Sequence, residues 1–512
     1  MKSRRLIAVL AAGALLLGGC GETKQQTSGG GGTAEYAITS EPTELTIWLV
    51  RSAESKIEEL PVWQEFARLT NVSLKTVSSN SISDATQAFN TLMASGDLPD
   101  LVAYDLGRDA FSKFGVEGAF ARLDELVNEE DTPNLAYQFG RSVVKNYITA
   151  EDGHIYYVPC INPPTVAEGW FIRQDWLDKL GIPTPTNTEE YYQALVAIRD
   201  GDPNGNGEKD EVPYFSRFGR VDDLLTLWDV RVPWDEKDGK VVYAPMTPEF
   251  KEAYTNVAKW YAEGLIDKEI YTRGGKSRDK LLGDNVGGST HDWFGTTAQF
   301  NDILAETVPG INFKPIAPPN GAEYYSRQEV ANKGVAISAT SDKKDIAIKF
   351  IDFIFSEPGS RLKNFGIEGE HYDLGEDGKP YFKDWILHGE KSTVNILEDI
   401  GAQGGFVGLQ DFWYEEQWLT PAAKEGANMY IENNLLVPQF PTLSYTKEEK
   451  AEFNKIMTAV QTHVDETCQK WVFGNEDVEE SYDQFISDLN SMNIGRAIEI
   501  QQAAYDRYLE AQ

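Results

Sequence analysis

The chain has 512 residues, of which 41% are hydrophobic and 12% aromatic, so it is long enough for two or three domains with substantial cores. Its formal net charge of −34 excludes a general binder of nucleic acids or anionic lipid surfaces, because phosphate groups would be repelled. Apart from Cys20, the cysteines are Cys160 and Cys468, without a Cys-x-x-Cys pair, which excludes a disulfide scaffold or a zinc module. Whether Cys160 and Cys468 pair is left open.

The N-terminus, MKSRRLIAVLAAGALLLGGC, is typical of an export signal. A basic front precedes an apolar run from Leu6 to Leu17, which is too short to span a bilayer. Small residues then lead to Cys20, a pattern that resembles a bacterial lipobox, in which the cysteine is acylated and becomes the mature N-terminus. An ordinary secretory signal with a chance cysteine is the alternative. We expect a signal peptide over 1–19, a lipid on Cys20 as the membrane anchor, and no transmembrane helix.

Residues 20–42 are rich in Gly, Ser, Thr and Gln and are expected to form a flexible tether. Strand patterns then alternate with helical ones: strands over 44–50, 72–77 and 97–105, and helices over 61–70 and 84–96. This alternation predicts an α/β fold with parallel strands, whose ligands lie beyond the carboxyl ends of the strands. Arg51, Tyr104 and Arg108 follow such ends and are therefore candidate binding residues.

The second part of the chain continues the pattern. Residues 153–182 predict a strand, a Pro-rich crossing, another strand and a helix that ends at Gly181. A long amphipathic helix is expected over 250–271, with a break at Gly264, and residues 331–359 predict a strand, a loop and a helix ended by Pro358. The last third is mostly helical, and no internal repeat is present.

The stretch DPNGNGEKDE, residues 202–211, contains no apolar residue. Its oxygen-bearing side chains recur at alternate positions around glycines, as in an EF-hand loop, and the series is Asp202, Asn204, Asn206, Glu208 (through its backbone carbonyl), Asp210 and Glu211. The usual glutamate at the twelfth position is absent, because Pro213 stands there. Hard oxygens without His or Cys favour Ca²⁺, so we expect a structural calcium site; a plain surface turn is the alternative.

Several stretches together resemble a known family. They are the lipobox; SGDLPDLVAYD; DGHIYYVP with WFIRQDWLDKLGIPTPTNTEEYYQAL; the Asn/Asp loop; KWYAEGLIDKEIY; GVAISATSDKKDIAIKFIDFIFSEPG; and FGIEGEHY. In order and spacing they are similar to the extracellular solute-binding proteins, family 1, of ABC importers. The nearest subgroup is the large lipoproteins that include the alginate-oligosaccharide-binding proteins, which carry a Ca²⁺ loop of the same compressed pattern.

The resemblance implies a two-lobe flytrap fold with hinge crossings. By this analogy, residues 43–160 and 335–357 form the N-terminal lobe, and residues 161–334 and 358–512 form the C-terminal lobe. It also implies a monomeric, lipid-anchored protein on the outer face of the cell membrane, which binds an oligosaccharide between the closing lobes and passes it to ABC permease subunits.

Sugars are bound by aromatic platforms and by polar side chains that form paired hydrogen bonds. In relatives a tryptophan at the place of Trp293 lies in the cleft, and an aromatic and an arginine stand at the places of Tyr104 and Arg108. The sequence HDWFG adds His291 and Asp292 to Trp293. With the strand-end residue Arg51 and the tryptophans beside turns, the candidate ligand residues are Trp48, Arg51, Tyr104, Arg108, Trp170, Trp228, His291, Asp292, Trp293 and Trp413.

Each aromatic residue could instead belong to the core. At helical spacing that interpretation is favoured for Trp63, Trp176, Trp260 and Trp471, and for Trp48 and Trp170 both interpretations are open. Glu370 and His371 fit either a hinge position or a capped turn.

Two other functions are kept as alternatives. A lipid-anchored glycoside hydrolase would need a carboxylate pair, which 81 Asp and Glu residues cannot exclude. The sequence nevertheless has no Gly-x-Ser-x-Gly elbow, no His-Glu-x-x-His motif and no Walker loop, so we expect a binding protein without catalysis. A peptide-binding lipoprotein of the same architecture is the other alternative.

Overall fold

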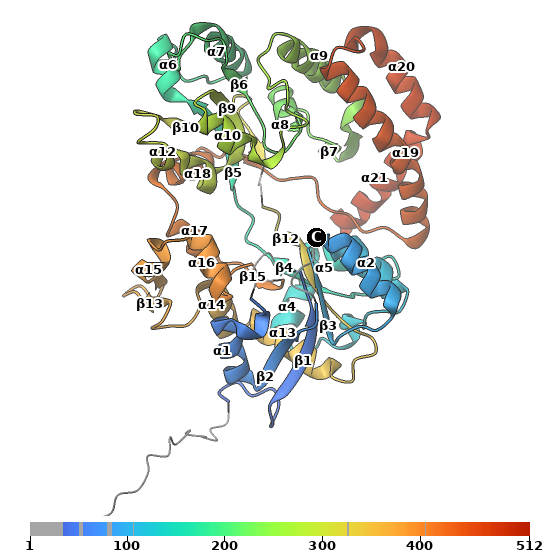
Figure 1. Ribbon diagram of the computed structural model, residues 1–512. Helices are drawn as coiled ribbons and strands as arrows, with labels where there is room; N and C mark the ends of the chain where they lie inside the picture. The colour runs from blue at the N-terminus through green and yellow to red at the C-terminus, as the bar shows by residue number, and fades with distance from the viewer. Residues whose placement is uncertain are drawn as a thin grey trace, which may run out of the picture.

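The computed structural model describes residues 34–50, 55–78, 84–105, 107–324, 327–404 and 406–511. The expected signal peptide, the lipidation site Cys20, most of the tether and Arg51 lie outside these ranges. Figure 1 shows two lobes, one above the other, with several chain segments running between them. None of the helices in the described ranges has the length and apolar content that crossing a bilayer requires.

The first lobe is built on a six-stranded sheet in the order β15-β4-β12-β3-β1-β2. Three of its strands, β1 (Thr43–Trp48), β2 (Val72–Thr76) and β3 (Leu101–Tyr104), are parallel and match the predicted strands. The strand β12 (Val330–Ile337) runs antiparallel between β3 and β4 (Val158–Ile161), and β15 (Gly408–Leu409) completes the edge beside β4. The sheet therefore joins segments from three distant parts of the sequence.

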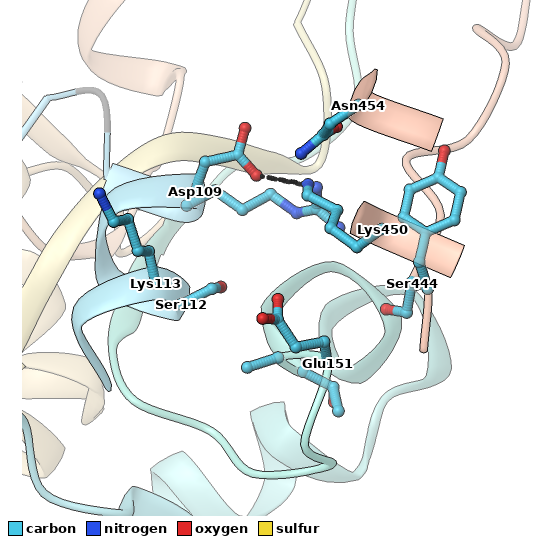
Figure 2. Close-up of a pocket in the computed structure, with 11 residues that line it drawn as sticks. Asp109, Ser112, Lys113, Glu151, Ser444, Lys450 and Asn454 are labelled. Atoms are coloured by element: carbon cyan, nitrogen blue, oxygen red, sulfur yellow. Dashed lines mark hydrogen bonds and ion pairs between the residues drawn. The ribbon is translucent and has the colours of Figure 1, made fainter. Parts of the chain in front are cut away.

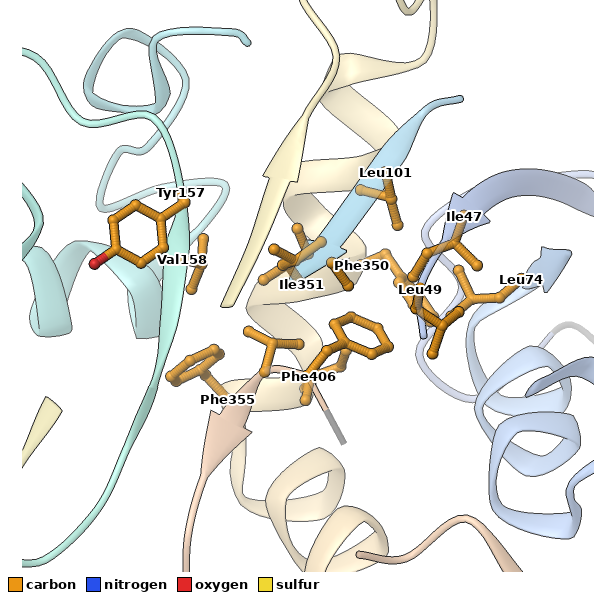
Figure 3. Close-up of a cluster of buried hydrophobic side chains, with 14 of the residues drawn as sticks. Ile47, Leu49, Leu74, Leu101, Tyr157, Val158, Phe350, Ile351, Phe355 and Phe406 are labelled. Atoms are coloured by element: carbon orange, nitrogen blue, oxygen red, sulfur yellow. The ribbon is translucent and has the colours of Figure 1, made fainter. Parts of the chain in front are cut away.

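Helices cover both faces of this sheet and bury one hydrophobic core. Figure 3 shows Ile351 of α13 with Leu101 of β3, Val158 of β4 and Phe406, all side chains of the same buried cluster. Local signals set the helix ends: Asp84 caps α2 by accepting a hydrogen bond from the backbone of Gln87, and Gly96 ends it with a positive φ of 67°. The helices of this lobe are α1 (Pro61–Thr70), α2 (Ala85–Ser95), α3 (Gly107–Val116), α4 (Pro133–Gly140), α5 (Ser142–Ile148), α13 (Lys344–Phe355), α14 (Glu357–Phe365), α15 (Asp384–Leu387), α16 (Thr393–Ile400) and α17 (Trp413–Glu416).

The boundary expected at residue 358 is corrected by the packing. Leu362 and Phe365 of α14 and Leu397 of α16 are buried in the core of the first lobe, and β15 pairs with β4. The hairpin of β13 (Tyr372–Leu374) and β14 (Pro380–Phe382) belongs to the same cluster through Tyr372 and Phe382. The amphipathic pattern predicted helices here, but such a pattern does not specify which of two cores a helix covers.

The second lobe is built on a four-stranded sheet in the order β10-β5-β9-β6. Here β5 (Glu168–Arg173) runs antiparallel to β9 (Gly287–Trp293) and β10 (Phe313–Ile316), and β6 (Val212–Tyr214) runs parallel to β9. Separate hydrophobic clusters include Trp170 of β5 and the adjacent Phe171, whose side chains point to opposite faces of the sheet. Two small two-stranded sheets pair β7 (Trp234–Lys237) with β8 (Lys240–Tyr243), and β11 (Glu323–Tyr324) with β16 (Leu436–Val437).

The helices of the second lobe include α9, which runs from Pro248 to Ala262 and is followed by a turn at Gly264, close to the predicted break. Trp63 of the first lobe and Trp176, Trp260 and Trp471 of the second are all buried, which confirms the core positions predicted for them. The remaining helices are α6 (Gln174–Leu180), α7 (Thr188–Gly201), α8 (Asp222–Leu225), α10 (Ser277–Gly283), α11 (Phe294–Ala298), α12 (Phe300–Ile303), α18 (Pro421–Glu432), α19 (Lys447–Val472), α20 (Val478–Ser491) and α21 (Ile494–Glu510).

Two points left open by the sequence are settled. Cys160 and Cys468 are both buried and form no disulfide, since Cys160 lies in a strand of the first lobe and Cys468 in the core of the second. His371 is a buried turn residue whose Nδ1 accepts a hydrogen bond from the backbone N–H of Ile367 at 2.8 Å. Of the two interpretations of this residue, the capped turn is the one observed.

Gly334 gives a test of how β12 fits between its neighbours. A Cβ atom at this position would lie 2.3 Å from the carbonyl oxygen of Val158 and 3.1 Å from the Cα of Pro159. We expect Gly334→Ala to lower the free energy of unfolding by about 1–3 kcal/mol, because backbone must move to relieve the overlap. Urea denaturation followed by circular dichroism measures the effect.

The matched control is Gly495→Ala in the first turn of α21, where nothing lies within 4 Å of the added methyl group. We expect no loss of stability there, since alanine is the better helix former. Equal unfolding midpoints for the two variants would show that β12 does not approach β4 as closely as described.

Candidate functional site

A cavity of about 800 Å³ lies where the two lobes meet. This volume is within the range of small-molecule binding sites. The first lobe contributes Arg108 of α3, and the second contributes the inner ends of β5 and β9, the short helix α8, the turn before β7, and α19 and α21. The lining residues come from four separate parts of the sequence: Arg108; Glu168 to Trp234; His291 to Gln328; and Gln439 to Gln501.

The lining combines aromatic rings with amide side chains. Trp234, Phe440, Tyr445 and Phe453 supply the rings. Four glutamines, Gln328, Gln439, Gln461 and Gln501, each carry both a donor and an acceptor. Such a mixture suits a ligand that has apolar faces and a rim of hydroxyl groups.

A buried charged cluster stands at the inner end of β9. His291 is 6% exposed, and its Nε2 lies 2.9 Å from an oxygen of Glu323. Burial by itself lowers the pKa of His291, but Glu323, Asp223 and Glu168 outweigh burial and raise the pKa to about 10. The imidazole therefore carries both ring protons at neutral pH.

The carboxyl groups around His291 also have perturbed pKa values. Burial, together with Asp223, Asp292 and Glu323, raises the pKa of Glu168 to about 6, although His291 opposes this. Burial likewise raises the pKa of Asp222 to about 6, with a smaller contribution from Asp223. Both groups line the cavity, so its charge changes around pH 6.

Arg108 is the one predicted first-lobe residue that reaches this cavity within the described part of the chain. Its Nε donates to the carbonyl oxygen of Tyr147 at 2.8 Å, and its Nη2 donates to the carbonyl oxygen of Leu443 at 2.7 Å. The side chain thereby connects α5 of the first lobe with a second-lobe segment. It holds the cavity wall in place, and two of its N–H groups already donate to these carbonyl oxygens.

A second contact between the lobes lies beside Arg108. A smaller cavity of about 270 Å³ lies there. Figure 2 shows Asp109 and Lys113 of α3 opposite Lys450 and Asn454 of α19 in its lining. The Nζ atom of Lys450 lies 2.9 Å from Asp109. A hydrogen bond from Ser444 to the carbonyl oxygen of Asn146 adds to the contact.

Trp293 is partly exposed at the end of β9 and lies against the crossing segment. The guanidinium group of Arg327 stands 5.3 Å from the Trp293 ring centre and 4.1 Å from that of Phe412. An ion pair of 2.6 Å with Glu415 fixes the same guanidinium group. Trp293, Arg327 and Phe412 thus form a stack that joins the second lobe, a crossing and the segment leading back from the first lobe.

Trp413 lines a different cavity, of about 430 Å³, on the Arg327 side of the crossings. Its Nε1 donates to the carbonyl oxygen of Pro380, and Tyr381 meets it edge to face at 5.4 Å. Both lobes contribute to this cavity, since Lys424 and Ile431 of α18 line its other side. Trp413 therefore lines a space between the lobes that is separate from the 800 Å³ cavity, and its role as a ligand contact stays a prediction.

Three other sequence candidates turn out to be core residues, which corrects their assignment as ligand contacts. Trp170 is 0% exposed, because β5 lies inside the second-lobe sheet. Trp48 and Tyr104 are buried against Phe89 in the first core. Trp228 is partly buried, packs edge to face on Trp260 and does not line the 800 Å³ cavity. Strand-end position alone does not distinguish a side chain that points into the cleft from one that points into the core.

The assignment of Asp292 as a ligand contact is also corrected. It is 0% exposed and points away from the cavity, because successive residues of a strand face opposite sides. Arg217 donates to it at 2.7 and 2.8 Å, and Arg278 donates at 3.2 Å, so this carboxylate is fully used inside the lobe. Of the predicted pair, only His291 reaches the cavity.

The loop of residues 202–211 is compact and turns on two glycines with positive φ, Gly205 and Gly207. The carboxylate of Asp202 accepts hydrogen bonds from the backbone N–H groups of Gly205, Asn206 and Gly207 at 3.0–3.1 Å. The Nδ2 groups of Asn204 and Asn206 each donate to Asp210 at 3.0 Å. Within the described residues, no three His, Cys, Asp or Glu side chains gather closely enough to hold a metal by themselves.

Glu211 is the residue of this loop that points inward. It is 9% exposed, and neither carboxylate oxygen makes a hydrogen bond of ordinary geometry within the described chain; the backbone amides of Asn204 and Glu211 are its nearest donors. Burial, with Asp210 and Asp202 nearby, raises its pKa. A buried carboxyl group beside two other acidic side chains, at the end of a ring of oxygen-bearing side chains, fits a cation ligand.

Sequence reasoning missed most of the cavity. Arg220, Asp222 and Asp223 follow the end of β6, so the strand-end rule would have found them had β6 been recognised. Its three residues, Val212–Tyr214, are too few to give a periodic signal. Glu323 and Gln439 carry no local signal, because tertiary packing alone brings them to the cavity.

Comparisons with known proteins agree with this architecture. The model of the bacterial extracellular solute-binding protein family matches residues 52–360. The solved structure of alginate-binding protein AlgQ2, without calcium ion, is 37% identical, with a TM-score of 0.79 over 92% of this chain and 100% of that one.

Two curated relatives are similar at lower identity. The fructooligosaccharide ABC transporter substrate-binding protein FusA of Streptococcus pneumoniae is 24% identical over 84% of each chain. The polygalacturonan/rhamnogalacturonan-binding protein YtcQ of Bacillus subtilis is 24% identical over 74% of this chain and 76% of its own. Solved structures of FusA, one with kestose and one of an EF-hand mutant with fructo-nystose, share the fold at TM-scores of 0.73 and 0.71 and identities of 22% and 21%, each over 92% of this chain and 100% of its own. The chain therefore belongs to the bacterial extracellular solute-binding proteins.

Proposed function

We propose that this protein captures an oligosaccharide between its two lobes and delivers it to the permease subunits of an ABC importer. The observation that carries the proposal is the 800 Å³ cavity between the lobes, lined by aromatic rings and by four glutamines. The similarity to AlgQ2, FusA and YtcQ, whose names state carbohydrate ligands, supports the same class of ligand here. Capture requires no chemical change in the sugar, so no catalytic step is proposed.

The two-lobe architecture supplies the means of capture. Side chains that would contact one ligand come from both lobes, so a bound sugar stabilises the arrangement in which the lobes are closed over it. Trp293 and Trp413 are proposed to serve as platforms at the crossings. We also propose that a signal peptide over 1–19 directs export and that a lipid on Cys20 anchors the protein through the tether over 20–42. The protein is proposed to act as a monomer at the outer face of the membrane.

We further propose that the 202–211 loop binds one structural Ca²⁺. The carboxyl groups of Asp202, Asp210 and Glu211 and the amide oxygens of Asn204 and Asn206 are the side-chain donors, with the backbone carbonyl of Glu208. Turning each asparagine amide by half a rotation about its last bond would present oxygen instead of nitrogen to the centre of the loop. The ion would neutralise the buried Glu211 and fix the link between α7 and β6, whose far end leads to the ligand cavity.

Ligand binding is tested by thermal unfolding with a panel of glycans. The panel contains neutral oligosaccharides such as kestose, nystose and xylotetraose, uronate tetramers from alginate and galacturonan, and control peptides. A ligand present at a hundred times its dissociation constant adds about 2.7 kcal/mol to the free energy of unfolding, so we expect at least one glycan to raise Tm. A shift with peptides alone would contradict the sugar assignment, and release of cleaved sugar would favour the hydrolase alternative.

Trp293 is tested by substitution. We expect Trp293→Ala to weaken binding of the active glycan roughly tenfold or more, because a stacked ring is worth about 1.4 kcal/mol or more at a sugar face. Neither tryptophan lines the 800 Å³ cavity, but Trp293 stands at the crossing beside Arg327, whereas Trp385 is 48% exposed on α15 and meets His371 of the first lobe, so Trp385→Ala is the matched control. Isothermal titration calorimetry measures both. Equal affinities of the two variants would remove Trp293 from the site.

Calcium is tested by chelation. We expect EDTA to lower Tm and added CaCl₂ to restore it at neutral pH, because without the ion nothing offsets the repulsion among Glu211, Asp210 and Asp202. The raised pKa of Glu211 means that the folded protein without calcium holds this proton to a higher pH than the unfolded chain does. Without calcium, ionisation of Glu211 therefore lowers the free energy of unfolding as pH rises through that pKa. The increase in Tm on adding CaCl₂ is expected to become smaller as pH falls.

Two variants sharpen the calcium test. Glu211→Gln removes a proposed carboxylate ligand and should abolish most of the CaCl₂ effect. Glu208→Gln should preserve it, because Glu208 is exposed and is proposed to contribute only its backbone carbonyl. If EDTA leaves the Tm of the unaltered protein unchanged, the loop is a plain turn.

A further inference from the structure

Asp223 carries a carboxyl group at the cavity wall whose contacts with the neighbouring cations are long. The residue stands in the short helix α8 and lines the 800 Å³ cavity, with 13% of its side chain exposed. Its Oδ2 is buried and has no hydrogen-bond partner in the described chain. Its Oδ1 lies 3.8 Å from Arg220 and 3.8 Å from His291, beyond hydrogen-bond range in both cases.

His291 has an unused donor at the same place. Its Nε2–H is taken by Glu323, and its Nδ1 is buried without a hydrogen-bond partner. Because the raised pKa keeps the ring protonated, Nδ1 carries a hydrogen and can act only as a donor. A donor without an acceptor thus faces an acceptor without a donor, with 3.8 Å between Nδ1 and Oδ1.

Such a pair is costly to keep. A buried polar group without a hydrogen bond costs roughly 1–3 kcal/mol, and more when it is charged. A core made only for stability would move the two groups together or replace them. A hydroxyl group donates one hydrogen bond and accepts others, so one hydroxyl placed between the two groups would satisfy both.

We propose that Asp223 and His291 form a recognition site for one hydroxyl group of a neutral sugar unit, which accepts from His291 Nδ1–H and donates to the Asp223 carboxyl. This inference rests on the proposed function and names the class of sugar unit at this position. Glu323 acts as a positioning residue, because its ion pair fixes both the orientation and the charge of the imidazole.

The surroundings favour a hydroxyl over the carboxylate of a uronic acid. Glu168, Asp222 and Glu323 line the cavity beside Asp223, and mutual repulsion already contributes to the raised pKa values of Glu168 and Asp222. Two of the cations in the lining have resident partners, whereas Arg220 lies 3.8 Å from Asp223 itself. Arg108 is bonded to two carbonyl oxygens, and Arg231 lies 3.3 Å from Asp229. A further anion would therefore add to the repulsion at this point.

The test is a double-mutant cycle that combines a protein variant with a ligand derivative. Affinities are measured by isothermal titration calorimetry on the mature protein. The probe is the glycan of the panel above that binds most tightly, together with its monodeoxy derivatives. We expect one deoxy position to weaken binding to the unaltered protein about tenfold to a hundredfold, as for other hydrogen bonds to charged groups. Asp223→Ala should weaken binding of the parent glycan by a similar factor. In that variant, replacing the parent glycan by the deoxy derivative should cause little further loss of affinity.

Stability supplies a readout that separates recognition from a structural role. Since the Asp223 carboxyl makes no hydrogen bond, Asp223→Asn and Asp223→Ala should unfold at the same temperature as the unaltered protein or higher. Asp483→Asn, an exposed carboxylate on α20, is the control and should change neither Tm nor affinity. A marked drop in Tm for Asp223→Asn would show a structural role and overturn the inference.

Uronate tetramers and their carboxyl-reduced, neutral forms test the charge preference directly. We expect each reduced form to bind at least tenfold more tightly than its uronate parent. Tighter binding of the uronates, or unchanged glycan affinity in Asp223→Ala, would overturn this site while leaving the proposed function intact. If no glycan of the panel binds the unaltered protein, both proposals fail.

Discussion

The division into two hydrophobic cores is the constraint on which the rest of this structure depends. Each sheet is covered by its own helices, and β12 carries the chain from the second lobe into the centre of the first sheet, between β3 and β4. Neither core extends across the boundary, and cavities lined by both polar and aromatic side chains lie where the lobes meet. A ligand that enters between the lobes meets groups from both, which makes its binding sensitive to their arrangement.

The electrostatics of the boundary follow from the same division. On the crossing side, Arg327 is held between two rings and a carboxylate, so its charge is neutralised locally. At the end of β9, His291 is neutralised by Glu323, but Asp223 beside it is not similarly bonded. Ion pairs therefore secure the walls of the cavity, while Asp223 Oδ2 and His291 Nδ1 in its lining have no hydrogen-bond partner in the described chain.

Membership of a family with shared architecture does not fix the ligand. Relatives of similar fold are named for alginate, for fructooligosaccharides and for pectic polymers, which differ in charge as well as in ring form. The scaffold supplies two lobes and their crossings, whereas the side chains that line the space between them decide what is bound. In this chain those side chains come from short or irregular segments such as α8 and residues 439–445.

The sequence by itself determined the α/β class, the first three strands, the breaks at Gly96, Gly181 and Gly264, and the core positions of tryptophans at helical spacing, because these depend on local periodicity and on backbone preferences. It did not determine that residues 362–407 pack on the first core, that Trp170 is fully buried, or that Asp223 and Glu323 meet at His291. Those outcomes required the tertiary structure. An amphipathic pattern shows that one face of a helix will be buried but not which partner will cover it. Contacts between residues distant in sequence leave no trace in hydrophobic periodicity or in local backbone preferences.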